Sequence, residues 1–292
     1  MGMFEGAFTA LVTPFREDRL DEKAVRALVS EQIAGGVAGL VPSGTTGESA
    51  SLSHTEYSRL LELVVDEARG RVPVVAGAGA ASTAHAIELA KLAQRAKVDA
   101  LLIVAPYYYK PSQDGIVAHY AAIARAVPLP IVVYNIPGRT GMDIAAATFE
   151  RLAQIPSIVA VKESTGNVVR SAELVSRLGD RLSVLSGDDG LTLPIMAVGG
   201  KGVISVASNA VPAEVTRQVE LFRGGDLAGA RKQHQRLAPL YEALFVEPNP
   251  SPVKAALAMR GLLTGELRLP FVPVSESTQK RLRKILVELG VL

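Results

Sequence analysis

The sequence predicts a single (β/α)8 barrel, and three observations favour this fold class. Eight short, nearly continuous apolar runs rich in Val and Ile occur along the chain, as expected for strands buried on both faces. Segments with apolar residues at helical spacing separate these runs. The length of 292 residues is one that such barrels routinely reach as one domain. An open doubly wound sheet has the same alternation but usually fewer strands in one uninterrupted series, so we favour the barrel.

The elements can be assigned in chain order. The predicted strands are 8–14, 39–44, 73–79, 100–106, 130–136, 158–164, 183–189 and 202–208. The clearest helix is 54–68, because Ser53 and Glu56 in front of it match a capping box. Further candidate helix N-caps are Ser82, Asp143 and Asn167.

After residue 224 the alternation stops and only helical patterns follow. The predicted helices are 225–245, 251–263 and 275–289, with a proline-rich break at 248–252. We therefore expect residues 1–224 to form the barrel and residues 225–292 to form a helical extension packed on it, in one structural unit.

Composition excludes several classes of function. Hydrophobic residues make up 48% of the chain, which is enough for a substantial core, and a net charge of +2 without a basic, aromatic-rich run argues against nucleic-acid binding. The chain has no cysteine, which excludes disulfides and thiolate catalysis. The N-terminal segment has no signal-peptide pattern, and no apolar run reaches the roughly 18 residues of a membrane span. We expect a cytoplasmic protein that acts on neither membranes nor nucleic acids.

Lys162 is the principal candidate for a catalytic residue. Active residues of such barrels lie at the carboxyl ends of strands, and Lys162 follows the apolar run 158–161. Burial there disfavours the charged ammonium, which makes the nucleophilic amine more available. A lysine that extends to the rim or pairs with Glu163 is the structural alternative. Lys201 precedes its strand, Lys110 lies in a loop and Lys254 lies on a late helix, so these lysines fit less well.

Other polar residues follow neighbouring strands. Tyr134 ends the preceding strand and could transfer protons near Lys162, while Arg139 in the next loop suits a substrate carboxylate. Each also has a structural alternative, as a rim tyrosine or as an arginine that holds its loop. Thr45 and Thr46, in a glycine-flanked turn after the second strand, could hold a small carboxylate through hydroxyl and N–H groups.

Two further patterns do not support a cofactor or metal. The segment 77–82 approaches a dinucleotide-binding GxGxxG pattern, but the third glycine is missing and Asp99 precedes its strand instead of ending one. The four histidines fall in predicted helices without HExxH spacing, so we assign no metal. They are His54, His85, His119 and His234.

Five motifs together resemble the dihydrodipicolinate synthase/N-acetylneuraminate lyase family. They are GTTGES (44–49), YYYKPSQDG (107–115), YNIPGRTG (134–141), VKES (161–164) and SGDD (186–189). The similarity extends from Phe4 to about Ser208, and NPSPVKAAL (249–257) continues it. The resemblance implies a barrel that forms a lysine imine with pyruvate and needs neither a metal nor an organic cofactor.

The resemblance also implies roles for individual residues. Lys162 would form the imine, Thr46 would hold the pyruvate carboxylate, and Gly187 and Ile204 would line the pyruvate pocket. Tyr134, Thr45 and Tyr108 would relay protons, with Tyr108 reaching into a partner subunit of a homo-oligomer, a tetramer built as a dimer of dimers.

The sequence constrains the second substrate, to which the enamine adds, less than it constrains the imine step. Thr45, Thr46, Tyr108 and especially Arg139 match the synthase branch of the family, in which the enamine adds to L-aspartate-4-semialdehyde to give 4-hydroxy-tetrahydrodipicolinate on the route to lysine. A sugar-acid aldolase or dehydratase of the same family is the first alternative. A non-catalytic small-molecule-binding protein is a remote one, because it would have no use for a lysine at the barrel mouth.

The resemblance bears on regulation as well. Family members that lysine inhibits bind it at a subunit interface near the residue corresponding to Tyr107. They carry an asparagine where this chain has Ala81, a glutamate where it has His85 and a histidine where it has Tyr57. Without the carboxylate and the amide, a buried lysine ammonium lacks partners, which could cost on the order of 1–3 kcal/mol for each loss. We expect little inhibition by lysine.

Overall fold

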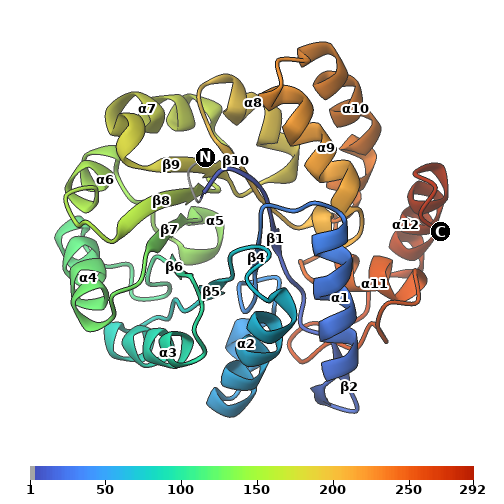
Figure 1. The fold of residues 1–292 in the computed structure, drawn as a ribbon, viewed down its shortest axis with the longest axis horizontal. Helices are drawn as coiled ribbons and strands as arrows, with labels where there is room; N and C mark the ends of the chain where they lie inside the picture. Colours follow the sequence, from blue (N-terminus) through green and yellow to red (C-terminus); the bar gives the residue numbers. More distant parts are fainter. Residues whose placement is uncertain (1–3) are drawn as a thin grey trace.

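The predicted eight-stranded parallel barrel is confirmed by the computed structural model, which describes residues 4–292 apart from the side chain of Asp180 (Figure 1). Neighbouring strands follow the order β4-β1-β10-β9-β8-β7-β6-β5. The strands of the barrel are β1 (Gly6–Ala10), β4 (Gly39–Val41), β5 (Val75–Gly77), β6 (Ala100–Val104), β7 (Ile131–Asn135), β8 (Ile158–Glu163), β9 (Ser183–Ser186) and β10 (Gly202–Ser205). A separate antiparallel ribbon is formed by β2 (Phe15–Arg16) and β3 (Arg19–Leu20).

The barrel closes between β4 and β5. Leu40 forms a parallel bridge with Val74, and its N–H donates to the carbonyl of Pro73 at 2.9 Å. At the other end of this short pair, the N–H of Gly77 donates to the carbonyl of Pro42 at 2.9 Å. These bonds join the first and last strands of the sheet, so no strand edge is left open.

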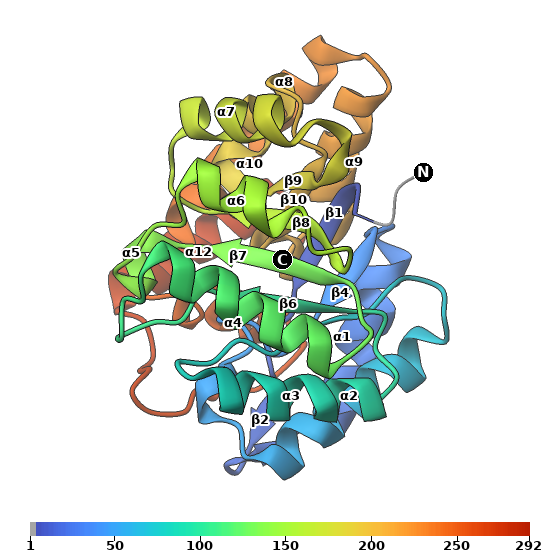
Figure 2. The ribbon, with the colours of Figure 1, turned by 90° about the vertical axis from the view of Figure 1, so that its left-hand side faces the viewer.

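Helices surround the strands as a ring (Figures 1 and 2). They are α1 (Glu22–Ala34), α2 (His54–Ala68), α3 (Thr83–Arg95), α4 (Gln113–Ala126), α6 (Ala146–Leu152), α7 (Val168–Leu178), α8 (Thr192–Ala197) and α9 (Pro212–Arg223), while the short α5 (Pro137–Thr140) lies in the loop directly after β7, inside the ring. Figure 2 shows α3, α4, α6 and α7 stacked side by side against the strands. Short 3-10 turns are η1 (Ser49–Ser51), η2 (Gly179–Arg181), η3 (Asp189–Leu191) and η4 (Ala207–Asn209).

The core has two layers because alternate residues of each strand point to opposite faces. Outward-facing residues pack against the helices in the larger cluster. Inward-facing residues fill the barrel itself, so the barrel is a packed core and not a channel. The inner cluster comprises Phe4, Phe8, Ala10, Val41, Val75, Ala100, Leu102, Val132, Tyr134, Ala160, Leu185 and Ile204.

All eight predicted strands are present, but each ends earlier at its carboxyl end than predicted. The predicted strand 8–14 is observed as Gly6–Ala10, two residues earlier at its start and four at its end. Beyond Ala10, the Val12 N–H donates to the side chain of Asn209 at 3.1 Å instead of to a neighbouring strand. A side chain therefore accepts the backbone N–H group where the strand leaves the sheet. The apolar run continues past this point, so apolar character alone does not locate the end of the strand.

Most of the predicted helix caps are confirmed. Ser53 and Glu56 form the capping box, and the side chains of Ser82 and Asn167 each accept a backbone N–H in the first turn of their helices. The prediction for Asp143 is wrong. Its helix begins at Ala146, where the side chain of Gln113 accepts the N–H of Ala145 at 3.0 Å.

Asp143 has a different partner. Its carboxylate accepts a hydrogen bond from the side-chain amide of Asn135, at the end of β7, at 2.7 Å. The cap that Gln113 supplies and the hydrogen bond between Asp143 and Asn135 are both tertiary interactions, which the local sequence does not reveal.

The three C-terminal helices are observed where the sequence predicts them. They are α10 (Leu227–Ala243), α11 (Ser251–Met259) and α12 (Glu276–Glu288), and α11 and α12 pack against each other outside the ring (Figure 1). Arg260, after α11, forms an ion pair with Glu31 of α1 at 2.7 Å. Arg268 binds Glu56 of α2 at 2.5 Å. The extension is thus tied to the first two helices of the barrel.

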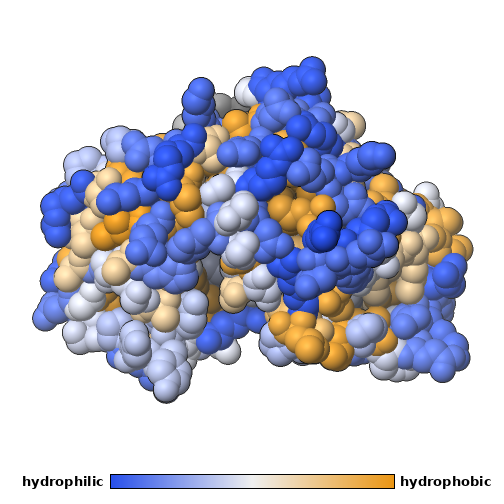
Figure 3. Space-filling model, turned by 90° about the horizontal axis from the view of Figure 1, so that it is seen from below, coloured by the Kyte–Doolittle hydropathy of each residue, from blue (hydrophilic) through white to orange (hydrophobic). Residues whose placement is uncertain are grey.

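The molecular surface mixes hydrophilic side chains with separate hydrophobic patches. Figure 3 shows this arrangement on the face seen from below, where hydrophilic groups lie between the apolar patches. Across residues 4–292, none of the helices combines the length and the apolar character needed to cross a bilayer.

The way in which the barrel closes predicts that substitution of Gly77 lowers the stability of the protein. A Cβ atom on this residue would lie 2.0 Å from the carbonyl oxygen of Ser43, a backbone atom that cannot rotate away. We expect Gly77→Ala to lower the free energy of unfolding by about 3 kcal/mol, measured by urea denaturation, because the β4–β5 pair must separate. Gly44→Ala is the control, since its Cβ would meet nothing within 4 Å. Equal stability of the two variants would contradict this account of closure.

Candidate active site

Lys162 projects into the barrel near the carboxyl end of β8. Ala160 belongs to the inner cluster, and because side chains alternate along a strand, Lys162 points the same way two residues later. It is 5% exposed. Tyr134 is its register partner on β7, and the Lys162 Nζ lies 4.1 Å from the centre of the Tyr134 ring. The structure therefore brings these two predicted residues into direct contact.

Glu163 is not the partner of Lys162. Its carboxylate accepts hydrogen bonds from the Asn135 side-chain amide at 3.2 Å and from the Thr165 N–H at 2.8 Å. Burial raises the pKa of Glu163 above its usual value. Among residues 4–292, Lys162 forms no ion pair, so the alternative in which Glu163 neutralises it is wrong.

Gly187 makes room for the Lys162 side chain. A Cβ atom at this position would lie 2.9 Å from Cε of Lys162, and would also collide with the hydroxyl oxygen of Ser164. That hydroxyl is buried and has no hydrogen-bond partner within the described chain, so it is available to a ligand at Lys162. Ile204 of β10 is 1% exposed in the inner cluster. Gly187 therefore borders the lysine, and Ile204 contributes an apolar wall to the barrel interior.

The turn after β4 is fixed by the C-terminal extension. Glu48 has a positive φ of 53° and a fully buried side chain, which forms an ion pair with Lys254 of α11 at 2.5 Å. The Lys254 Nζ also lies 4.4 Å from the centre of the Phe15 ring. Two residues earlier, the Thr46 hydroxyl accepts a hydrogen bond from the Asn249 amide at 3.0 Å. Residues about 200 positions apart thus hold the predicted carboxylate-binding turn.

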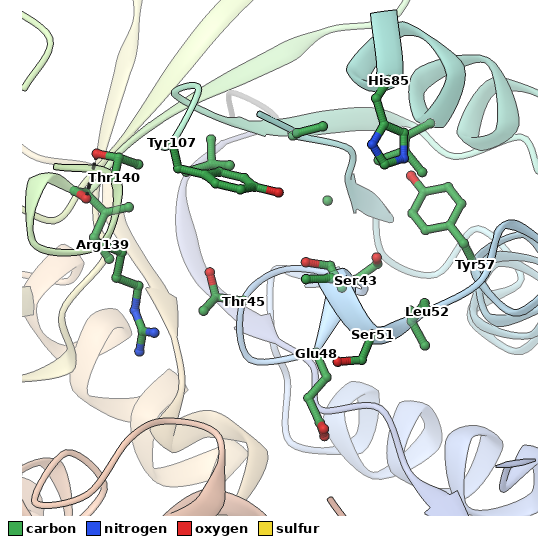
Figure 4. Close-up of a pocket in the computed structure, with 18 of the residues that line it drawn as sticks. Ser43, Thr45, Glu48, Ser51, Leu52, Tyr57, His85, Tyr107, Arg139 and Thr140 are labelled. Atoms are coloured by element: carbon green, nitrogen blue, oxygen red, sulfur yellow. Dashed lines mark hydrogen bonds between the residues drawn. The ribbon is translucent and has the colours of Figure 1, made fainter. Parts of the chain in front are cut away.

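Thr45 and Arg139 line a cavity of about 370 Å³ beside the barrel mouth. Figure 4 shows them on one side of the cavity, with Tyr57 and His85 on the other side and the Tyr107 hydroxyl directed between. Arg139 lies in α5, and its side chain is exposed. Lys162 and Tyr134 are not part of the cavity lining, because they lie deeper in the barrel. Of these four predicted residues, Lys162 and Tyr134 therefore form a buried pair, and Thr45 and Arg139 line the cavity outside it.

Tyr108 does not join either group within this chain. Its side chain is 83% exposed, and its φ of 71° is unusual for a residue with a large side chain. Its ring contacts that of Tyr109 with centres 5.7 Å apart. A positive φ on a bulky residue costs free energy. The turn therefore keeps Tyr108 in an unfavourable backbone conformation, in which its side chain projects away from the barrel.

Asp189 is a buried acid that the sequence analysis did not select. Its carboxylate accepts hydrogen bonds from the Ser205 hydroxyl at 2.5 Å and from the N–H groups of Val206 and Ala207 at 2.9 and 3.0 Å. Burial raises the pKa of Asp189 above its usual value. The carboxylate joins the loops after β9 and β10, which carry Gly187 and follow Ile204, so it stabilises the lysine's surroundings.

The other lysines have structural positions. Lys201 precedes β10, as predicted, and so lies at the opposite end of the barrel from the site. Lys254 is more deeply buried than Lys162, but Glu48 neutralises it. The contributions of Glu48, Asn249 and Lys254 are not predicted from the sequence, although all three lie in the motifs GTTGES and NPSPVKAAL. No local pattern indicates that the two motifs meet.

Fold and site together define a (β/α)8-barrel protein with a buried lysine and tyrosine at the carboxyl ends of adjacent strands. The chain belongs to the Dihydrodipicolinate synthetase family, whose model matches residues 3–289. The family predicted from the motifs is thereby confirmed.

Relatives match over nearly the whole chain. A 4-hydroxy-tetrahydrodipicolinate synthase of Sorangium cellulosum is 55% identical over 95% of this chain and 93% of its own length. The one of Syntrophus aciditrophicus is 47% identical over 99% of this chain and all of its own length. Among solved structures, the dihydrodipicolinate synthase of Thermotoga maritima superposes with a TM-score of 0.98 at 40% identity and covers both chains completely. That of Aquifex aeolicus has a TM-score of 0.97 at 42% identity over 99% of each chain.

The buried ion pair predicts that the site and the extension lose stability together. Lys254→Met leaves the Glu48 carboxylate buried without a counter-charge, so we expect the free energy of unfolding to fall by about 3–5 kcal/mol. The double variant Glu48→Gln/Lys254→Met should recover part of this loss. Because we propose that barrel and extension form one structural unit, circular dichroism should show a single transition in each variant.

Lys284→Met is the matched control. Lys284 is exposed and lies 3.8 Å from Glu288, so its removal should change stability by no more than about 0.5 kcal/mol. A Lys254 variant as stable as this control would show that the buried pair does not hold the turn.

Proposed function

We propose that this protein is a Schiff-base-forming lyase that condenses pyruvate with L-aspartate-4-semialdehyde to give 4-hydroxy-tetrahydrodipicolinate. The observation that carries the proposal is the buried Lys162, which has no ion-pair partner among the described residues and packs against Tyr134 near the end of β8. The names of the relatives described above, which are similar over nearly the whole chain, support the choice of reaction.

The first half of the reaction forms the nucleophile. The neutral amine of Lys162 attacks the C2 carbonyl carbon of pyruvate, and loss of water gives an imine. A proton then leaves C3, and the electron pair moves to form an enamine. Tyr134, whose ring contacts the lysine amine, is positioned to carry protons in these steps. Thr46 would hold the pyruvate carboxylate, because Asn249 fixes its hydroxyl.

The second half joins the two substrates. The enamine C3 attacks the aldehyde carbon of the semialdehyde, whose oxygen takes up a proton and becomes the 4-hydroxyl group. The substrate's own amino group then attacks C2 and displaces the Lys162 amine, which closes the ring and frees the enzyme. One water molecule is lost overall. Arg139, exposed in the cavity, is suited to the acceptor's carboxylate through its planar guanidinium.

The proton relay would extend beyond one chain. Thr45 lies in the cavity wall, and Tyr108 projects outward, where it could reach a neighbouring subunit. We therefore propose a homo-oligomer, a tetramer built as a dimer of dimers, in the cytoplasm. A solved relative, 40% identical, is described as the first monomeric dihydrodipicolinate synthase variant, so size-exclusion chromatography with light scattering is the test of the proposed tetramer.

The remaining alternatives have less support. A sugar-acid aldolase or dehydratase would use the same imine, but the relatives described above bear the synthase name. A non-catalytic binding protein would not require the room that Gly187 provides for an unpaired buried lysine.

Trapping with borohydride tests the nucleophile. Sodium borohydride in the presence of pyruvate should reduce the imine, inactivate the protein and leave one pyruvyl-derived group on Lys162, as located by peptide mass spectrometry. Lys162→Ala should lower turnover by at least about a thousandfold, because the covalent route is lost. Lys201→Ala, at the other end of the barrel, should keep full activity. An adduct on another lysine would refute the assignment.

The role of Arg139 can be separated from imine formation. If it binds the acceptor carboxylate, Arg139→Ala should lower kcat/KM for the semialdehyde by about 10- to 100-fold, since charged hydrogen bonds are lost. The rate of borohydride trapping with pyruvate should change little. Arg151→Ala, a surface arginine paired with Asp114, is the control. Equal losses in both half-reactions would indicate that Arg139 only holds its loop.

Inhibition by lysine should be weak. Glu48 is the one carboxylate among the described residues that line the cavity, and Lys254 already neutralises it. A lysine ammonium therefore finds no free counter-charge in the lining. We expect little loss of activity at millimolar lysine, a scale typical of weak ligands. The double variant Ala81→Asn/His85→Glu should become clearly more sensitive, whereas strong saturable inhibition of the unmodified protein would contradict the prediction.

A further inference from the structure

Two histidines from different helices meet in the wall of the cavity. His54 begins α2 and His85 lies in the first turn of α3. Their Nε2 atoms are 3.3 Å apart, and their ring centres are 5.5 Å apart. Glu88 lies on the same face of α3 as His85, three residues later. One potential ligand atom from each of the three side chains lies within 4.8 Å of the others.

The spacing of the two nitrogens matches that of ligands sharing one metal ion. Zinc binds histidine nitrogen at about 2.0–2.1 Å and prefers tetrahedral geometry, which places two such nitrogens about 3.4 Å apart. The observed 3.3 Å agrees with this value. A carboxylate with two imidazoles is a common set of zinc ligands that leaves a fourth position for water.

Tyr57 gives an independent indication of a polar ligand at this place. Its side chain is 2% exposed, and its hydroxyl has no hydrogen-bond partner within residues 4–292. Figure 4 shows this hydroxyl directed at the ring of His85. A buried hydroxyl without a partner costs free energy, and a water molecule bound to a metal ion on the histidines would satisfy it.

We propose that His54, His85 and Glu88 bind one divalent ion of the zinc class, with a water molecule as the fourth ligand and Tyr57 as its hydrogen-bond partner. The site holds α2 and α3 together at the wall of the cavity that Thr45 and Arg139 also line. It does not depend on the proposed lyase reaction, because it shares no ligand with Lys162.

A hydrogen bond between two neutral imidazoles is the simpler use of the same contact. It would account for the two nitrogens but leaves the Tyr57 hydroxyl without a partner and gives Glu88 no role. Both histidines lie at helix N-termini, whose partial positive charge opposes a cation. The Glu88 carboxylate supplies the negative charge that offsets this effect.

The sequence predicts no metal site because the histidines lack the HExxH spacing of ligands within one helix. The ligands found here come from two helices, and only the packing of α2 against α3 brings them together. The inference therefore arises from the fold and has no local sequence signal.

Zinc titration of the full-length protein after dialysis against a chelator tests the proposal. Isothermal calorimetry and competition with a chromogenic chelator should give one Zn²⁺ ion per chain. His54→Ala and His85→Ala should each weaken binding by at least about a hundredfold, and Glu88→Gln and Tyr57→Phe by about 10- to 100-fold. The absorption spectrum of the Co²⁺-substituted protein should show the intense visible bands of a tetrahedral site.

His234→Ala is the control, because His234 lies on α10 outside the cluster, and it should bind zinc as the unmodified protein does. Absence of saturable binding would overturn the proposal and leave only a contact between two histidines. Binding that survives both His54→Ala and His85→Ala would also overturn it, since the ion would then lie elsewhere. Circular dichroism of each variant distinguishes a lost ligand from a lost fold.

Discussion

The register between β7 and β8 determines which way Lys162 points, and the candidate site depends on it. In this register Tyr134 lies opposite Lys162, and both side chains enter the barrel above the packed inner layer of Val132 and Ala160. A shift of one residue would turn the lysine toward the outer helices and direct Val161 inward. Burial of the apolar residues on both faces of β8 thus fixes the orientation of the lysine side chain that the site requires.

Two lysines of the described residues, Lys162 and Lys254, are buried, and their surroundings differ. Lys254 is fully buried, and its amine is held by Glu48 over the ring of Phe15, which gives it a structural role. Lys162 is nearly as buried but has no carboxylate partner in the part of the chain that the structure describes, and the missing side chain of Gly187 leaves space beside it. Burial alone therefore does not identify a nucleophile. The absence of a counter-charge and the presence of room for a substrate distinguish the two residues.

The sequence predicts the parts of the structure that local pattern controls. Continuous apolar runs identify all eight strands, and the position of Lys162 at the end of one of them selects the candidate nucleophile. Contacts between distant segments are not predictable in this way. The Glu48–Lys254 pair spans more than 200 residues, and the contact between His54 and His85 depends on how two helices pack. Asp143 illustrates the same limit, because a tertiary bond to Asn135 replaces the expected local cap.

The central claim is that Lys162 forms a covalent bond with pyruvate inside the barrel, and a crystal structure of the protein with pyruvate tests it most directly. The account predicts continuous electron density from the Lys162 Nζ to C2 of the ligand, with the ligand carboxylate at the Thr46 turn and the Tyr134 ring beside the new bond. Pyruvate bound without a covalent link, or joined to another lysine, would contradict the account.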